Sequence, residues 1–212
     1  MARGTSKEER AAEKAARQQE SATRRKRAAL KKRAINVVVI ALIAGGLWAF
    51  FFLPRQGSYS AGGNGDVIEG VQIYHNPTGH TLEAVNYPQT PPAGGEHNPT
   101  WLNCGIYKES VPNVYAVHAL EHGAIWVTYD PKLSAEALAA LRQHLPSTYV
   151  VLSPYVGLPA PIVLSAWNAQ LLVQTPDDPR LPRFFEEYWR NQKVPEPGAL
   201  CTGGIDGPGR ES

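Results

Sequence analysis

Apolar residues form one continuous run in the first quarter of the chain and shorter periodic patterns further on. Residues 35–53 read INVVVIALIAGGLWAFFFL and contain no charged side chain. A helix of that length spans about 28 Å, close to the roughly 30 Å hydrocarbon core of a bilayer. Helices packed on a protein core keep a polar face, whereas this run is apolar on every face. The pattern therefore predicts one transmembrane helix.

The periodic patterns predict an α+β fold, a mixed sheet with packed helices. Strands are expected at VQIY (71–74), AIWVTYD (124–130), TYVVLSPY (148–155) and PIVLSAWN (161–168), with QLLVQT (170–175) continuing or following the last. Helices are expected at VYAVHALEHG (114–123), SAEALAALRQHL (134–145) and PRLPRFFEEYWRNQ (179–192). This order predicts one right-handed β-α-β crossover followed by an antiparallel hairpin. It resembles a thioredoxin-like element order, although the sequence contains no C-x-x-C motif.

Charge is distributed unevenly and sets the expected orientation. Residues 1–34 carry 12 Lys/Arg and 4 Glu, a net charge of +8, whereas residues 35–212 carry 9 Lys/Arg and 15 Asp/Glu, a net charge of −6. Positive residues beside a membrane span favour the cytoplasmic side. We expect a basic cytoplasmic tail on anionic lipid and an extracytoplasmic remainder, with the bilayer as partner and no nucleic acid. The long run favours an uncleaved anchor over a signal peptide cleaved after Ser60.

Composition divides the part after the run into three segments. Residues 54–70 are rich in glycine and predict a flexible stalk. Residues 71–204 are long enough for a globular domain with a core, and residues 205–212 predict a disordered tail. Residues 75–113 are dense in Pro, Gly and Asn, but aromatic residues within them can anchor loops to a core. Ordered loops are therefore expected there.

The chain has two cysteines, Cys104 and Cys201. In an oxidising compartment outside the cytoplasm, a disulfide between them is the expected state. The alternative is that Cys104 serves as a metal ligand near His97.

Two of the six histidines, His118 and His122, lie four residues apart and share one face of a predicted helix. This spacing lets both imidazoles reach one ion, and His97 in the preceding loop can fold back onto that face. We expect these three histidines to hold zinc or copper, because both metals suit imidazole ligands. Glu121 lies beside the pair as a ligand, a partner of a ligand, or a base. The structural alternative keeps the histidines as hydrogen-bonded supports of the fold.

Three classes of function follow from these residues. The favoured class is a membrane-anchored extracytoplasmic binding domain with a role in envelope metal handling. The second is a zinc hydrolase: in H-x-x-E-H enzymes the histidines bind zinc, Glu121 would act as base, and a downstream glutamate, such as Glu186 or Glu187, completes the ligands. The third is an envelope interaction protein with structural histidines. Hydrolysis is disfavoured because the motif helix ends at Gly123, where a catalytic helix would usually run on, and because the domain is far smaller than those enzymes. In addition, FFEEYW (184–189) is typical of a surface helix with its glutamates on the solvent side. The sequence also contains no nucleophile elbow or P-loop.

The segments PPAGGEHNPTWLNCGIY (91–107), VYAVHALEHGAIWVTYD (114–130) and VLSAW (163–167) resemble a known family. Across residues 70–204 the chain is similar to the actinobacterial-type single-pass membrane proteins grouped as domain of unknown function 3105. The resemblance implies the same plan of basic tail, single anchor and outer domain. The histidine motifs of the family map onto His97, His118 and His122, with Glu121 and Gly123 in the second motif. The resemblance implies a shared site at these positions and no particular activity.

Overall fold

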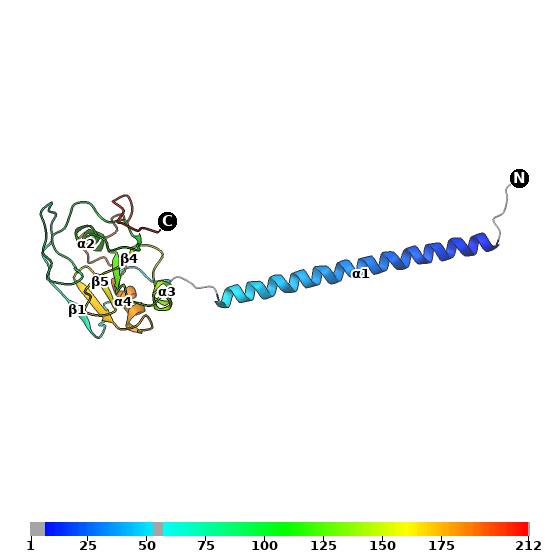
Figure 1. The fold of residues 1–212 in the computed structure, drawn as a ribbon, viewed down its shortest axis with the longest axis horizontal. Helices are drawn as coiled ribbons and strands as arrows, with labels where there is room; N and C mark the ends of the chain where they lie inside the picture. The colour runs from blue at the N-terminus through cyan, green and yellow to red at the C-terminus, as the bar shows by residue number, and fades with distance from the viewer. Residues whose placement is uncertain (1–6, 53–56, 212) are drawn as a thin grey trace. The chain divides into compact units, whose positions relative to one another are not determined.

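The computed structural model describes residues 7–52 and 57–211, and the chain divides into two compact units after Pro54. In the first unit, the basic tail and the apolar run form one helix, α1 (Lys7–Phe52) (Figure 1). Among the residues described, no helix combines the length and the hydropathy that a membrane crossing requires. The structure therefore does not support the predicted transmembrane helix of residues 35–53, of which Leu53 lies outside the described residues.

The second unit is built on a six-stranded mixed sheet with the strand order β1-β6-β5-β3-β4-β2. The strands are β1 (Val71–Ile73), β2 (Gly105–Ile106), β3 (Ile125–Tyr129), β4 (Val150–Pro154), β5 (Ile162–Ala166) and β6 (Ala169–Val173). The helices are α2 (Asn113–Glu121), α3 (Ala135–Gln143) and α4 (Arg180–Tyr188). Strands β2, β4 and β3 are parallel neighbours, whereas the neighbours β3, β5, β6 and β1 pair antiparallel. The predicted α+β fold with a mixed sheet is confirmed.

The predicted elements occur in the predicted order. Strands β3 and β4, which α3 connects, are parallel, as a β-α-β unit requires. Strands β5 and β6 form the antiparallel hairpin, so QLLVQT contributes a strand of its own. Asn168 turns the chain between them with φ of 59°, a conformation that asparagine tolerates better than most residues. The pattern does not predict β2, because two residues are too few for a periodic signal.

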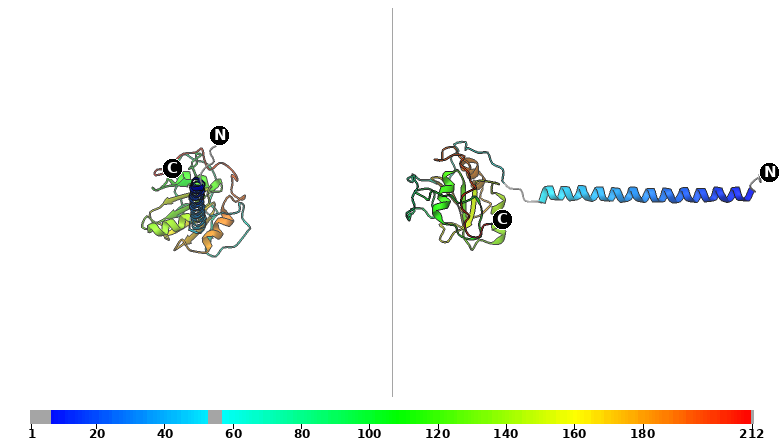
Figure 2. Two further views of the ribbon diagram at one scale, coloured as in Figure 1. Left: turned by 90° about the vertical axis from the view of Figure 1, so that its right-hand side faces the viewer. Right: turned by 90° about the horizontal axis from the view of Figure 1, so that it is seen from above.

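Both faces of the sheet are covered (Figure 2). On one face, α3 and α4 pack over the central strands and bury Leu141, Phe184 and Phe185 completely. On the other face, α2 and the loops pack over Trp126 and Val151. Helix α2 lies between the sheet and the loops, so its six residues from Ala116 to Glu121 are all buried. Polar side chains on this helix are therefore enclosed between two layers.

Hydrogen bonds hold the loop region 75–113 against the end of the β5–β6 hairpin. Gln170 Nε2 donates to Pro91 O at 3.0 Å, and the Asn168 N–H donates to Ala93 O at 2.6 Å. A little further along, the Asn98 N–H donates to Val114 O at 3.3 Å, at the start of α2. These contacts place the loop that carries His97 over α2.

Residues 57–70, which composition assigns to a flexible stalk, instead pack against α4 and are called the docked segment below. Tyr59 stacks on Phe185 with 5.0 Å between ring centroids, and Ile68 joins the core. Glu187 Oε2 accepts the backbone N–H groups of residues 64, 65 and 66 at 2.8, 2.8 and 3.0 Å. Glycine-rich composition indicates a loose chain, but a buried carboxylate that collects three donors fixes the backbone. Residues 54–56 lie outside the described residues.

Residues 205–211, for which composition predicts disorder, follow the surface of the domain. Ile205 forms a bridge to Leu102, and Arg210 forms one to Tyr107 beside β2. The Arg142 guanidinium donates to both side-chain oxygens of Glu211, to Oε1 at 2.7 Å and to Oε2 at 3.2 Å. Backbone pairing and this ion pair order the segment in spite of its glycines. Ser212 lies outside the described residues.

Candidate metal centre

Helix α2 carries the H-x-x-E-H motif, and local sequence sets where it ends. Helix α2 ends at Glu121, His122 is its C-cap residue, and the Gly123 N–H donates to Leu120 O at 2.9 Å. Gly123 has φ of 91°, which glycine adopts without strain, so the predicted stop at Gly123 is confirmed. His118, Glu121 and His122 are 2%, 4% and 2% exposed. All three motif side chains are therefore inside the domain.

Two loops cross α2 and bring two more histidines to it. The Thr81 N–H donates to His97 O at 2.7 Å, and the His97 N–H donates to Gly79 O at 3.0 Å. This short parallel pairing sets the His80 and His97 rings 4.9 Å apart between centroids. The His118 ring lies 4.9 Å from the His80 ring and 4.8 Å from the His97 ring. Three imidazoles therefore meet above α2.

The inner cluster is defined as His80, His97, His118 and Glu121. Each of the four offers one ligand atom, and these atoms lie within 4.8 Å of one another. Glu121 Oε2 is 2.9 Å from His97 Nε2 and 3.4 Å from His80 Nε2. Three members are buried, whereas the His80 side chain is 41% exposed. Three imidazoles and a carboxylate at this spacing are a ligand set suited to zinc or copper.

Hydrogen bonds determine which ring nitrogens are free. His97 Nδ1 lies 2.7 Å from Gly95 O, and His118 Nδ1 lies 2.7 Å from Asn98 O. A carbonyl oxygen only accepts, so each Nδ1 donates and a neutral ring keeps its lone pair on Nε2. In His97 that Nε2 faces the Glu121 carboxylate, which is a second acceptor. Either the buried ring carries a proton on each nitrogen, or a cation lies between Nε2 and the carboxylate. Histidines that bind a metal through Nε2 regularly donate their Nδ1 hydrogen to a backbone carbonyl.

Electrostatics favours the ligand forms of His118 and Glu121. Burial lowers the pKa of His118 below its ordinary value, and positive charge on His122 and His97 lowers this pKa further. The hydrogen bond to the Asn98 backbone and the charge of Glu121 act in the opposite direction without reversing the shift. Burial alone would raise the pKa of Glu121, but the hydrogen bond from His97 and the charges of His97, His118 and His80 outweigh it, so this pKa is lowered. A neutral imidazole and an ionised carboxylate are the forms that bind metals.

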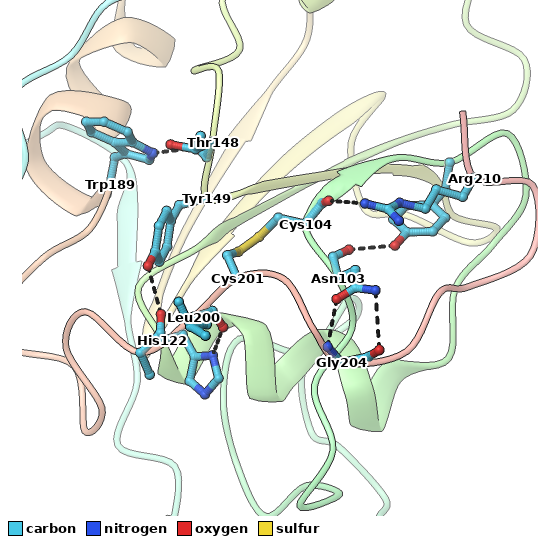
Figure 3. Close-up of a disulfide and its surroundings, with 12 residues drawn as sticks. Asn103, Cys104, His122, Thr148, Tyr149, Trp189, Leu200, Cys201, Gly204 and Arg210 are labelled. Atoms are coloured by element: carbon cyan, nitrogen blue, oxygen red, sulfur yellow. Dashed lines mark hydrogen bonds between the residues drawn. A yellow bond between two sulfur atoms is a disulfide. The ribbon is translucent and has the colours of Figure 1, made fainter. Parts of the chain in front are cut away.

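The outer group is defined as His118, His122 and Glu196, whose ligand atoms also lie within 4.8 Å of one another. His122 Nδ1 lies 2.7 Å from Leu200 O, and Figure 3 shows this contact beside the disulfide. His122 Nε2 lies 3.3 Å from Glu196 Oε2, and the Glu196 side chain is 46% exposed. His122 is therefore oriented as His97 is, with Nδ1 on a carbonyl and Nε2 toward a carboxylate. His118 belongs to both groups.

The disulfide Cys104–Cys201 holds the C-terminal segment that carries Glu196 (Figure 3). The two Cα atoms are 5.3 Å apart, and the Cys104 N–H donates to Cys201 O at 2.8 Å. The predicted disulfide is confirmed, so Cys104 is not a ligand beside His97.

The structure divides the three predicted metal residues between the two groups. His97 meets His118 in the inner cluster, and His122 meets His118 in the outer group. Among the described residues, no group of potential ligands holds all three. The two glutamates considered as downstream zinc ligands are elsewhere: Glu186 and Glu187 accept backbone N–H groups of the docked segment.

Sequence patterns do not identify His80 and Glu196. The chain contains H-N-P-T twice, at 75–78 and at 97–100, which signals two related loops. That repeat would select His75, which is exposed, instead of His80, which reaches the cluster. Glu196 stands in a Pro- and Gly-rich stretch, and only the disulfide indicates that this stretch returns to the loop region.

The chain also matches a family model described as "Protein of unknown function (DUF3105)", over residues 80–203. The match begins at His80 and extends beyond Glu196, so it includes every member of the inner cluster and the outer group. No curated protein and no solved structure shows significant similarity to the chain. Because the matched residues make up more than half of its length, the chain belongs to the DUF3105 family of proteins of unknown function.

Proposed function

We propose that this domain binds a transition-metal ion in the inner cluster. The observation that carries the proposal is the arrangement of His97, whose two ring nitrogens both face oxygen acceptors while the ring is fully buried. A neutral imidazole has a single N–H and cannot donate to both. A metal ion bound to Nε2 and to the Glu121 carboxylate removes the conflict and leaves Nδ1 to donate to the backbone.

The donor set supports zinc or copper as the ion. Three imidazoles and one carboxylate supply four ligands, and neutral imidazoles with one carboxylate leave a divalent ion only partly neutralised. Four protein ligands are typical of zinc sites that hold the metal, whereas catalytic sites keep one position open. His80 is the exposed member, so it is the ligand that can move aside to admit the ion.

We also propose that the domain works outside the cytoplasm, anchored to the membrane by residues 35–53, with a role in envelope metal handling. The uncharged run and the net charge of +8 before it support this location, and so does the disulfide, because such bonds persist in oxidising compartments. The test is a reporter enzyme fused after Ser212. If the reporter is active only in the cytoplasm, the proposed location is wrong, whereas the proposed metal binding is unaffected.

The hydrolase alternative has weaker support. Its base would be Glu121, but Glu121 Oε2 is 2.9 Å from His97 Nε2 and 3.4 Å from His80 Nε2. A carboxylate engaged by two imidazoles is a poor acceptor for the proton of an attacking water. The contacts of Glu121 therefore favour binding over hydrolysis. The third class, an interaction protein with structural histidines, predicts the same fold without any metal.

Metal content of the purified full-length protein tests the proposal. After dialysis against zinc or copper and then against buffer, we expect stoichiometric metal in the wild type and a loss of at least about tenfold in affinity in His97→Asn and His118→Asn. His75→Asn is the matched control, because His75 is an exposed histidine followed by the same N-P-T residues. Wild-type protein that takes up neither metal at micromolar concentration would leave the histidines as supports of the fold.

A further inference from the structure

The outer group is assembled from two distant parts of the chain. His118 lies in the last turn of α2 and His122 is the C-cap of that helix, whereas Glu196 follows α4 in the C-terminal segment. The Glu196 N–H donates to Glu121 O at 3.2 Å, which fastens the segment to the end of the helix. This contact sets the Glu196 carboxylate 3.3 Å from His122 Nε2. An imidazole and a carboxylate therefore stand at a separation that one ion can bridge.

His122 resembles His97 in that an oxygen acceptor lies beside each of its two ring nitrogens. Its Nδ1 lies 2.7 Å from Leu200 O and its Nε2 faces Glu196, so both nitrogens meet oxygen acceptors. The His122 side chain is 3% exposed, which leaves little room for water to reorganise around the ring. A neutral ring can satisfy only one of the two acceptors. A cation between Nε2 and the carboxylate satisfies the second.

The carbonyl that orients His122 is itself fixed on both sides (Figure 3). On one side of Leu200, the Ala199 carbonyl accepts a hydrogen bond from Tyr149 Oη at 2.8 Å. On the other side, Cys201 is joined to Cys104. These contacts therefore hold the imidazole in one orientation before an ion binds, as the hydrogen-bond partners of metal-binding histidines do.

We propose that the outer group is a second metal position, which binds a divalent ion of the zinc or copper class through two imidazoles and one carboxylate. It rests on the proposed function because His118 is shared. When one ion is bound, His118 completes the inner cluster. When a second ion binds, His118 serves the outer group and the inner ion keeps His80, His97 and Glu121. The Glu196 side chain is 46% exposed against 6% for Glu121, so the outer position is the one that exchanges ions with solvent.

Zinc titration of the oxidised full-length protein by equilibrium dialysis tests this inference. We expect two zinc ions per wild-type chain, the second bound more weakly, and one ion in Glu196→Ala and in His122→Asn. The affinity for the first ion should change by less than about threefold in Glu196→Ala, because its ligands remain. Glu96→Ala is the matched control: it removes an exposed carboxylate beside His97 that belongs to neither group, and it should keep two ions.

The outcomes separate the two proposals. Saturation of the wild type at one ion, or retention of two ions in Glu196→Ala, overturns the second position. If that single ion is lost in His97→Asn, the proposed function stands while the second position falls. A wild type that binds no ion overturns both. Thermal melting of each variant, monitored by circular dichroism, shows whether the chain is folded. A folded variant that binds fewer ions has lost a ligand and not its fold.

Discussion

Replacement of both Cys104 and Cys201 by serine removes a covalent link across 97 residues of sequence. Closing a loop of that length lowers the entropy of the unfolded chain, and the chain-entropy relation gives about 4.7 kcal/mol at 25 °C, with about 2–4 kcal/mol usual in practice. For a domain of this size, 1 kcal/mol corresponds to about 2–4 °C in melting temperature. We therefore expect the double variant to melt about 5–15 °C below the wild type.

The assay compares metal-free wild type and double variant by circular dichroism, with wild type in a dithiol reductant as a second reference. Serine leaves no thiol to form mixed disulfides, so aggregation through cysteine does not obscure the result. A decrease of less than about 2 °C would refute the loop-closure reasoning. It would mean that noncovalent contacts, such as Tyr149 Oη to Ala199 O and the Ile205–Leu102 bridge, hold the segment by themselves.

Three further predictions concern the packing of the domain. Glu187→Gln removes the charge that binds three backbone N–H groups, so it should cost about 1.5–3 kcal/mol and speed proteolysis within the docked segment; unchanged cleavage would argue against docking. Phe185→Ala empties a fully buried position and should cost about 3–5 kcal/mol in urea denaturation, and a cost below about 1 kcal/mol would contradict the packing of α4 against the sheet. The hydrogen bond from Arg142 is the main cause that lowers the pKa of Glu211, so this stabilisation is present above the ordinary value of 4.5 and is lost as pH falls through the lowered value. Glu211→Gln should accordingly lower the melting temperature at neutral pH and not in strong acid, and an equal decrease at both would exclude the ion pair.

The sequence predicts the helices and strands of the core because the signals for each element lie within that element. Ser134 marks the start of α3, and its Oγ accepts the Ala137 N–H at 3.2 Å, as an N-cap does. The aromatic and β-branched residues of β3 predict a strand, and all five of its residues are buried. Glycine-rich segments behave differently. The docked segment is ordered by Glu187, more than a hundred residues away in sequence, and no pattern within the segment reports that partner.

In the candidate site, too, one part can be predicted from the sequence and another part depends on tertiary contacts. The i, i+4 spacing of His118 and His122 follows from helix geometry and is visible in the sequence. The partner of each histidine is not visible there, because tertiary contacts select it. The pairing of two loops chooses His80, and the disulfide returns Glu196 to the end of α2. A single three-histidine site is therefore the simplest expectation from sequence, and two groups that share His118 are what the fold assembles.

Zinc-edge X-ray absorption of the purified full-length protein, loaded with one zinc ion per chain, tests the inner cluster most directly. We expect nitrogen and oxygen ligands at about 2.0–2.1 Å from the ion, with outer-shell scattering from imidazole rings. This imidazole scattering should decrease in His97→Asn and stay unchanged in His75→Asn. A zinc ion surrounded by oxygen ligands without imidazole scattering, or a protein that retains no zinc, would contradict the inner cluster as a metal centre.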